Sequence, residues 1–110
     1  MKRIDALGAA LAAVAARPER PATATLHDSP DARLIVFRLE PGQVVTPHTS
    51  TSSVLLVGLE GAGMVSGAAG EESIAAGEVV SYEPNELHGM RAGADRLVLL
   101  AVITPRPGTR

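Results

Sequence analysis

The sequence has 110 residues and no cysteine. Disulfide bonds, thiolate metal sites and cysteine nucleophiles are therefore excluded together, although this absence says nothing about the compartment. Aromatic residues are also scarce, since Phe37 and Tyr82 are the only two and tryptophan is missing. Bases or sugars that stack on aromatic faces are accordingly not expected as ligands.

The chain also lacks a surplus of basic residues and a long apolar run. The formal net charge is -2 and the pI is about 5.9, so nucleic acid is not expected as a partner. No run of about 18 apolar residues is present, which argues against a membrane span and a membrane partner. Hydrophobic residues at 45% and charged residues at 20% indicate one folded domain, for which we expect a cytoplasmic location.

An N-terminal helix is expected over residues 1–17. Its larger apolar residues recur at helical spacing and share one face: Ile4, Leu7, Leu11 and Val14. Asp5 suits the first turn, and Pro18 ends the helix because the residue before a proline avoids the α region. Such a short helix is marginal alone, so its apolar face must pack on the domain or on a second subunit.

A secretory signal peptide is the alternative for this segment. Lys2 and Arg3 precede the alanine-rich stretch, and residues 13–15, Ala-Val-Ala, have the form of a cleavage site. However, Asp5 and Gly8 interrupt the stretch, which contains more alanine than leucine. These interruptions favour the short helix.

Residues 18–110 are expected to form a single domain of short strands. Gly, Pro, Asn and Asp separate the candidate strands at positions typical of turns. The expected strands are Ala22–Leu26, Arg33–Leu39, Val44–Thr46, Ser53–Leu59, Gly63–Ser66, Glu72–Ile74, Glu78–Tyr82, His88–Arg91 and Arg96–Thr104. Many short strands with regular turns indicate an all-β sandwich or barrel.

Three segments are apolar at odd and even positions alike: Arg33–Leu39, Val54–Leu59 and Leu97–Ile103. A strand with one face in water would instead alternate between apolar and polar residues. The barrel interior covers one face, and the N-terminal helix, a second sheet or a partner subunit must cover the other. Homodimers commonly supply such cover, so we expect a homodimer.

The chain has three histidines, His27, His48 and His88. His27 precedes Asp28-Ser29-Pro30 and is interpreted as a surface turn residue. The segments around the other two histidines resemble the two sequence motifs of the cupin superfamily, whose members are small jelly-roll β-barrels. The resemblance covers residues 33–104.

The first cupin motif reads Gly, five residues, His, one residue, His, three or four residues, Glu, six residues, Gly. Gly42, His48 and Gly61 stand at these spacings. Ser50 replaces the second histidine and Val54 replaces the glutamate. In the family, the second histidine and the glutamate are two of the four metal ligands, so half of that ligand set is missing here.

The second motif reads Gly, five residues, Pro, one residue, Gly, two residues, His, three residues, Asn. Gly77 and His88 have the right separation, and Pro84 lies one place later than the family's proline. Asn85 stands for the second glycine, a mild change because Asn tolerates a positive φ, and Ala92 replaces the final Asn. The resemblance implies an all-β, cupin-type jelly-roll barrel with a short N-terminal helix.

In the family, the motif residues bind a divalent metal ion, and only His48 and His88 carry over. The resemblance therefore implies at most one divalent ion (Zn, Fe, Ni or Mn) and no other cofactor. Glu86 could complete a set of two histidines and one carboxylate, although an exposed loop carboxylate is the simpler interpretation. The alternative for the histidines is a metal-free pair, hydrogen-bonded to hydroxyls or to a small ligand.

Side-chain alternation predicts which residues surround this pair. In an extended chain, Ser50 and Ser52 share the face of His48, while Glu86 and Met90 share the face of His88. The hydroxyls would form a polar mouth suited to a small polar molecule, or else serve only the loop.

These features favour a protein that binds a small molecule over an enzyme. No Ser-His-Asp arrangement is legible and no catalytic residue is assigned. The alternative is a metal-dependent cupin enzyme, of the dioxygenase or isomerase type, with a reduced ligand set. In a third alternative, the cavity has lost its role and the domain serves assembly.

Overall fold

The computed structural model describes residues 1–108, which form one helix and nine strands. The elements are α1 (Ala6–Ala12), β1 (Ala22–Asp28), β2 (Arg33–Leu39), β3 (Val44–His48), β4 (Ser53–Glu60), β5 (Ala62–Gly67), β6 (Gly70–Ala75), β7 (Val79–Tyr82), β8 (His88–Ala92) and β9 (Leu97–Thr104). Each strand expected from the sequence is present, with ends that shift by no more than two residues. No helix in this described part of the chain is long and apolar enough to cross a membrane.

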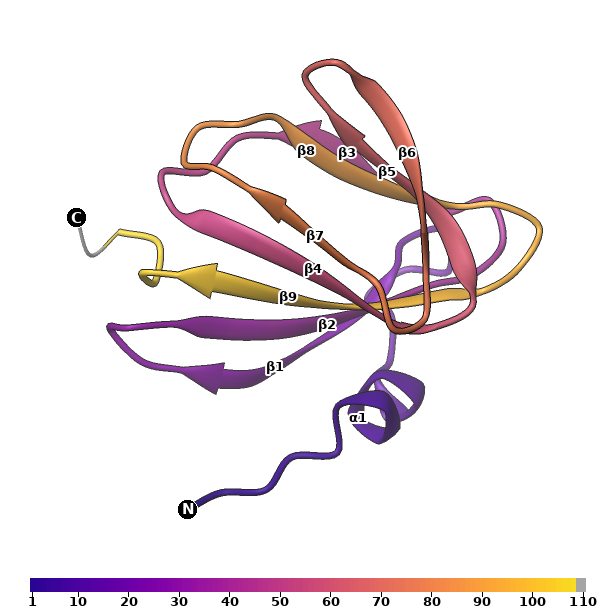
Figure 1. Ribbon diagram of the computed structural model, residues 1–110. Helices are drawn as coiled ribbons and strands as arrows, with labels where there is room; N and C mark the ends of the chain where they lie inside the picture. Colours follow the sequence, from indigo (N-terminus) through magenta and orange to yellow (C-terminus); the bar gives the residue numbers. More distant parts are fainter. Residues whose placement is uncertain (109–110) are drawn as a thin grey trace.

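The strands form two antiparallel sheets that face each other (Figure 1). One sheet has the order β1-β2-β9-β4-β7, and the other has the order β3-β8-β5-β6. Most neighbouring strands are distant in the sequence, as in a jelly roll. The all-β jelly roll expected from the sequence is thus confirmed.

Apolar side chains from both sheets fill the space between them. Leu39, Leu56 and Leu99 of the five-stranded sheet are at most 1% exposed. Val65 and Ile74 of the four-stranded sheet face them and are also buried. Each such side chain stabilises the fold by roughly 1.5–3 kcal/mol relative to an exposed one, so this core is the main source of stability.

Strand β9 lies at the centre of the five-stranded sheet and is buried on both faces. Leu97 and Leu99 face the core between the sheets, whereas Val98 and Leu100 face the opposite side. The sequence predicts that both faces of this strand are covered, and the structure confirms it. Figure 1 shows α1 beneath the five-stranded sheet, on the side away from the other sheet.

Helix α1 packs on the outer face of β1, β2 and β9. The buried members of this second apolar cluster are Ala10, Leu26, Val36 and Val98. Ile4 and Leu7 pack against the cluster, but Leu11 and Val14 remain 43% and 88% exposed. The helix therefore docks on its own domain through Leu7 and Ala10, whereas the end of its apolar face that carries Leu11 and Val14 stays exposed.

The helix is shorter than the expected residues 1–17. Asp5 is its N-cap, and the carboxylate accepts a hydrogen bond of 2.9 Å from the Gly8 amide. At the other end, Ala13 is already extended. The sequence pattern alone does not show that a distant side chain takes over the last carbonyl groups.

That side chain is Arg38 of β2. Its guanidinium donates hydrogen bonds to the carbonyl oxygens of Ala10, Leu11 and Ala13, at 2.6, 3.1 and 2.9 Å. It also forms an ion pair with Glu40 at 2.8 Å. The last carbonyls of a helix have no partner within the helix, so Arg38 both ends α1 and fastens it to the sheet.

We expect Arg38→Met to lower the free energy of unfolding by about 1.5–3 kcal/mol, because it removes charged hydrogen bonds but keeps the side-chain length. Urea denaturation measures this loss. Amide hydrogen exchange should also become faster in residues 6–13. Arg33→Met is the matched control, since Arg33 on the same strand makes only a 3.4 Å ion pair with Asp28. Equal losses in the two variants would contradict the anchoring role.

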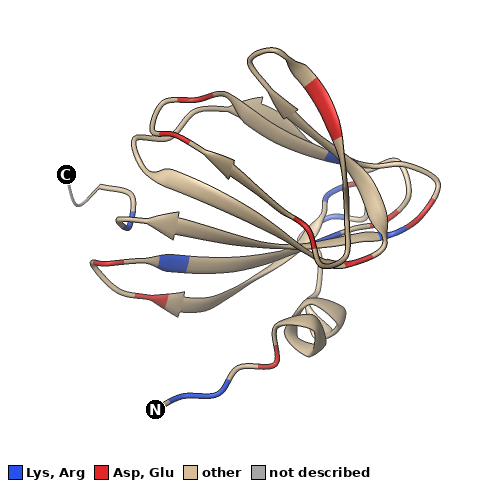
Figure 2. Cartoon of the chain, viewed as in Figure 1, with Lys and Arg blue, Asp and Glu red and all other residues tan. Residues whose placement is uncertain are grey.

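The outer face of β4 and β7 is apolar and is not covered by the main contacts of α1. Val79 and Leu55 are 58% and 38% exposed there, and Val57 lies between them, half-buried. Strands β7 and β9 contain no charged residue, as Figure 2 shows. This apolar strip is the surface on which the expected homodimer would form.

If a second copy covers this strip, Val79→Asp should weaken the dimer by roughly tenfold, because an interface core does not tolerate an unpaired charge. Light scattering on a sizing column at micromolar concentration measures the dimer fraction. Ser73→Asp, on the exposed face of β6, is the control and should leave the dimer intact. A monomeric wild-type protein at this concentration would contradict the prediction.

Candidate functional site

His48 and His88 lie opposite each other in the four-stranded sheet. His48 ends β3, His88 begins β8, and the two residues are cross-strand partners. Their ring centroids are 4.3 Å apart, and the ring planes meet edge to face at 63°. The structure thus brings together the two histidines that the cupin resemblance singles out. His27 is exposed in β1, where Nε2 lies 3.2 Å from the Ser29 hydroxyl.

A β-bulge in β3 places His48 on the same face of the four-stranded sheet as His88 and Met90. Val45 pairs with Met90, but the next pair is His48 with His88, so β3 has one extra residue between the two pairs. Because side chains alternate along a regular strand, His48 would otherwise point to the face opposite Val45. The bulge reverses this direction, which is a common use of bulges near binding sites.

Pro47 and Gly89 explain how the bulge fits. Pro47 has no amide proton for the ladder and is tolerated because β3 is an edge strand. A methyl group at Gly89 would lie only 3.0 Å from two carbon atoms of Pro47 and 2.8 Å from the Ser66 hydroxyl. Neither residue is predicted to shape the site, although a proline inside a β-rich segment is a sequence signal for such a bulge.

In both imidazole rings, Nδ1 forms a hydrogen bond with a backbone carbonyl oxygen. His48 Nδ1 lies 3.0 Å from the Thr46 carbonyl oxygen, and His88 Nδ1 lies 3.1 Å from that of Glu86. Because a carbonyl oxygen only accepts, Nδ1 of the neutral ring carries the proton and Nε2 keeps its lone pair. Two Nε2 atoms are thereby available to a metal ion, a water molecule or a ligand.

Tyr82 of β7 is the third ring of the site. Its centroid lies 5.3 Å from that of His88, and both side chains are 5% exposed. The hydroxyl donates a 2.8 Å hydrogen bond to the Ser66 carbonyl, which joins the two sheets across the interior. No local sequence pattern predicts that Tyr82 contacts a histidine of the other sheet.

Val54 and Ser50, which stand at the positions of the two missing cupin ligands, do not supply replacement metal ligands. Val54 is 3% exposed in the core and pairs with Tyr82 across the sheet. The Ser50 hydroxyl accepts a hydrogen bond from the Ser52 amide at 3.1 Å. No group of three His, Cys, Asp or Glu residues between 1 and 108 is arranged to hold a metal ion. An ion at the histidine pair would therefore need ligands from outside the protein.

Ser50 and Ser52 do not continue the face of His48 as expected. That expectation requires an extended chain, but β3 ends at His48 and residues 49–52 bend before β4. Ser52 is 2% exposed, and its hydroxyl donates a 2.6 Å hydrogen bond to the Pro105 carbonyl. The observed contacts of these hydroxyls thus hold the loop in place.

Glu86 and Met90 behave differently from each other. Met90 is 4% exposed and packs in the core, on the face that alternation predicts. Glu86 precedes β8, and its Oε1 accepts a 2.9 Å hydrogen bond from the Glu83 amide. The neighbouring Asn85 has a φ of 67°, as expected for a residue in the place of the family's glycine.

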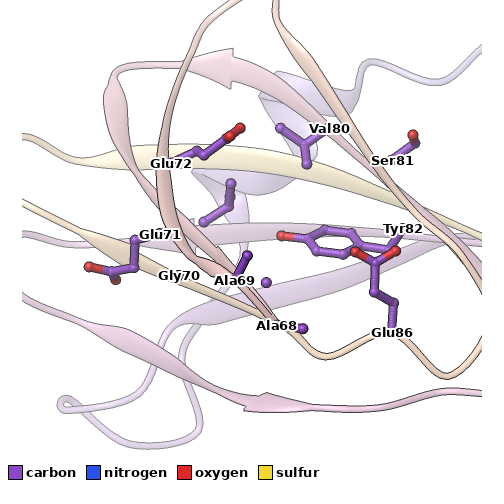
Figure 3. A pocket seen from close by; sticks show the side chains of 11 residues that line it. Ala68, Ala69, Gly70, Glu71, Glu72, Val80, Ser81, Tyr82 and Glu86 are labelled. Atoms are coloured by element: carbon purple, nitrogen blue, oxygen red, sulfur yellow. The ribbon is translucent and has the colours of Figure 1, made fainter.

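A cavity of about 360 Å³ opens beside Tyr82, between the β5–β6 hairpin and β7 (Figure 3). Its described lining consists of Val65, Gly67, Ala68, Ala69, Gly70, Glu71, Glu72, Val80, Ser81, Tyr82 and Glu86. Neither histidine lines it. Tyr82 therefore contacts the histidine pair and the cavity at once.

Comparisons with known proteins support the fold. No family profile matches the chain, and no curated protein matches it. Among solved structures, TT1209 from Thermus thermophilus is 27% identical with a TM-score of 0.85, over 97% of this chain and 100% of that one. An RmlC-like cupin protein from Desulfovibrio desulfuricans is 25% identical with a TM-score of 0.81, over 96% and 97% of the two chains. A conserved protein with a double-stranded β-helix domain from Klebsiella pneumoniae is 18% identical with a TM-score of 0.82, over 96% and 92%.

The burial of His88 makes the stability of the fold depend on pH. Burial lowers the pKa of His88 below its ordinary value of 6.5, and His48 lowers it further, while the hydrogen bond to the Glu86 carbonyl acts in the opposite direction. The unfolded chain therefore binds this proton more readily than the folded protein does. The stability contributed by His88 is complete above pH 6.5 and falls as the pH drops below it.

We expect the wild-type protein to lose more stability between pH 7.5 and pH 5.5 than His88→Gln does, in urea denaturation at the two pH values, which lie about one unit either side of the ordinary histidine pKa. His27→Gln is the control, since His27 is exposed and should leave the wild-type difference unchanged. An equal pH dependence in wild type and His88→Gln would refute the assignment.

Proposed function

Because this chain has the cupin fold and keeps His48 and His88 of the family's metal motif, we propose that it binds a small polar molecule at this pair without catalysing a reaction on it. The main support is the geometry of the two imidazoles. They are cross-strand partners, and the backbone holds both of them through Nδ1. A ligand can therefore donate hydrogen bonds to two neighbouring Nε2 atoms.

The residues around the pair favour binding over catalysis. Val54 and Ser50 stand where the family has a carboxylate and a second histidine. The Glu86 carboxylate accepts a hydrogen bond from its own turn. Among residues 1–108, no further acidic or histidine side chain is arranged to complete the ligand set that the alternative, a metal-dependent dioxygenase or isomerase, would need.

A divalent metal ion fits this proposal as a second component. His48 and His88 would hold the ion through Nε2, and the ion would supply a positive charge to which oxygen or nitrogen atoms of the ligand attach. The pair provides half of the family's ligand set. Affinity for the ion alone is therefore expected to be modest, and a ligand should increase it.

Calorimetry with ZnCl₂, NiCl₂ and MnCl₂ tests the metal component. We expect His48→Ala and His88→Ala each to abolish binding, because one imidazole does not hold an ion stably. His27→Ala is the matched control and should leave binding unchanged. Tight binding that survives both alanine substitutions at the pair would refute the site.

Ligand binding without a metal ion is tested by titrating ¹⁵N-labelled protein with acetate, phosphate and glucose. These probes represent carboxylates, anions and polyols. We expect at least one probe to shift the Nε2 signals of His48 and His88 together, and to lose this effect in His48→Ala. If no probe and no metal ion perturbs either ring, the proposal fails, and the alternative in which the domain serves assembly is favoured.

A further inference from the structure

We propose that the cavity beside Tyr82 is a second ligand site, which takes a small organic cation such as a primary amine. This inference goes beyond the site proposed at the histidine pair, because neither His48 nor His88 lines the cavity. It rests on the shape of the cavity, on a buried polar group at its wall and on the charge of its lining.

The cavity has room for a small molecule. Its volume of about 360 Å³ lies at the lower end of the range for ligand pockets, roughly 300–1,000 Å³. The hairpin tip over it, residues 67–70, reads Gly-Ala-Ala-Gly and has no side chain larger than a methyl group. Val65 and Val80 provide an apolar wall against which methylene groups can pack.

Tyr82 supplies the buried polar group. The side chain is 5% exposed, and its hydroxyl donates its proton to the Ser66 carbonyl at 2.8 Å. The phenolic oxygen can still accept a hydrogen bond, so a donor in the cavity is its natural partner. The face of the ring can also attract a cation.

Two carboxylates give the cavity its negative charge. Glu72 lies two residues from the fully buried Ile74 on β6, so it belongs to the inward face of that strand. Figure 3 shows Glu86 beside the Tyr82 ring and Glu72 farther away, beyond the hydroxyl end of the ring. Both carboxylates raise the pKa of Tyr82, although burial is the larger cause, so their field acts at this ring.

Among the residues that the structure describes, no Lys or Arg pairs with these two carboxylates. Of the eleven described residues that line the cavity, none is Lys, Arg or His. Glu71 is compensated by Arg91, which donates two hydrogen bonds to it at 2.8 and 3.0 Å. Within residues 1–108, Glu72 and Glu86 form no ion pair with Lys or Arg. A bound cation would supply the missing charge.

An organic cation fits this lining better than a metal ion does. A calcium ion needs six to eight oxygen ligands at about 2.3–2.6 Å. No three acidic or histidine side chains in the described chain converge in that way, and Oε1 of Glu86 already accepts a hydrogen bond from its own turn. An ammonium group on a short alkyl chain would satisfy the carboxylates, the Tyr82 oxygen and the apolar wall together.

The test is a titration of ¹⁵N-labelled protein with 1,4-diaminobutane and n-butylamine at constant ionic strength and pH. We expect saturable shifts in the amides of residues 67–70 and Tyr82. Glu72→Gln and Glu86→Gln should each weaken binding about threefold to fivefold, as for a partly exposed ion pair, and the double variant by about tenfold. Glu86→Gln keeps the oxygen that the Glu83 amide needs, so the turn is preserved.

Glu83→Gln is the matched control, because Glu83 lies next to the cavity in the sequence but does not line it. His48→Ala should bind the amines as the wild type does, which separates this site from the histidine pair. The proposal is overturned if butanoate binds as well as the amines, or if the glutamine variants match the wild type. It is also overturned if CaCl₂ shifts the same amides and the amines do not.

Discussion

The whole arrangement depends on β9, a central strand with apolar side chains on both faces. Such a strand is stable only if both faces are removed from water, and the two covers come from different parts of the chain. The four-stranded sheet covers one face and carries the histidine pair. Helix α1 covers the other, fastened by Arg38 from the neighbouring strand. The N-terminal segment is therefore part of the structure that holds the site, although it lies on the far side of the sheet.

The sequence predicts the strands well because Gly, Pro and Asn mark nearly every turn, and the cupin spacing predicts that His48 and His88 meet. It predicts the surroundings of the pair poorly. Alternation through Ser50 and Ser52 assumes an extended chain, whereas the chain bends after β3. Similarly, the length of α1 is decided by Arg38, which is distant in the sequence. The role of Tyr82 arises from contacts between separate segments, which no local pattern contains.

Tyr82 connects the two proposed sites. One ring contacts His88, stands in the wall of the acidic cavity and joins the two sheets through Ser66. The pair and the cavity therefore share one buried side chain, even though their lining residues differ.

The bulge around Pro47 has a consequence for the behaviour of the protein in a crowded solution. An exposed strand edge offers its free amides and carbonyls to any other extended chain, which is how sheets of different molecules join and precipitate. Strand β3 forms such an edge, but Pro47 offers no amide proton and the bulge breaks the regular spacing of its partners. The bulge that turns His48 toward His88 thus also protects the β3 edge from pairing with strands of other molecules. Removing it to reshape the site would expose the sheet to its neighbours.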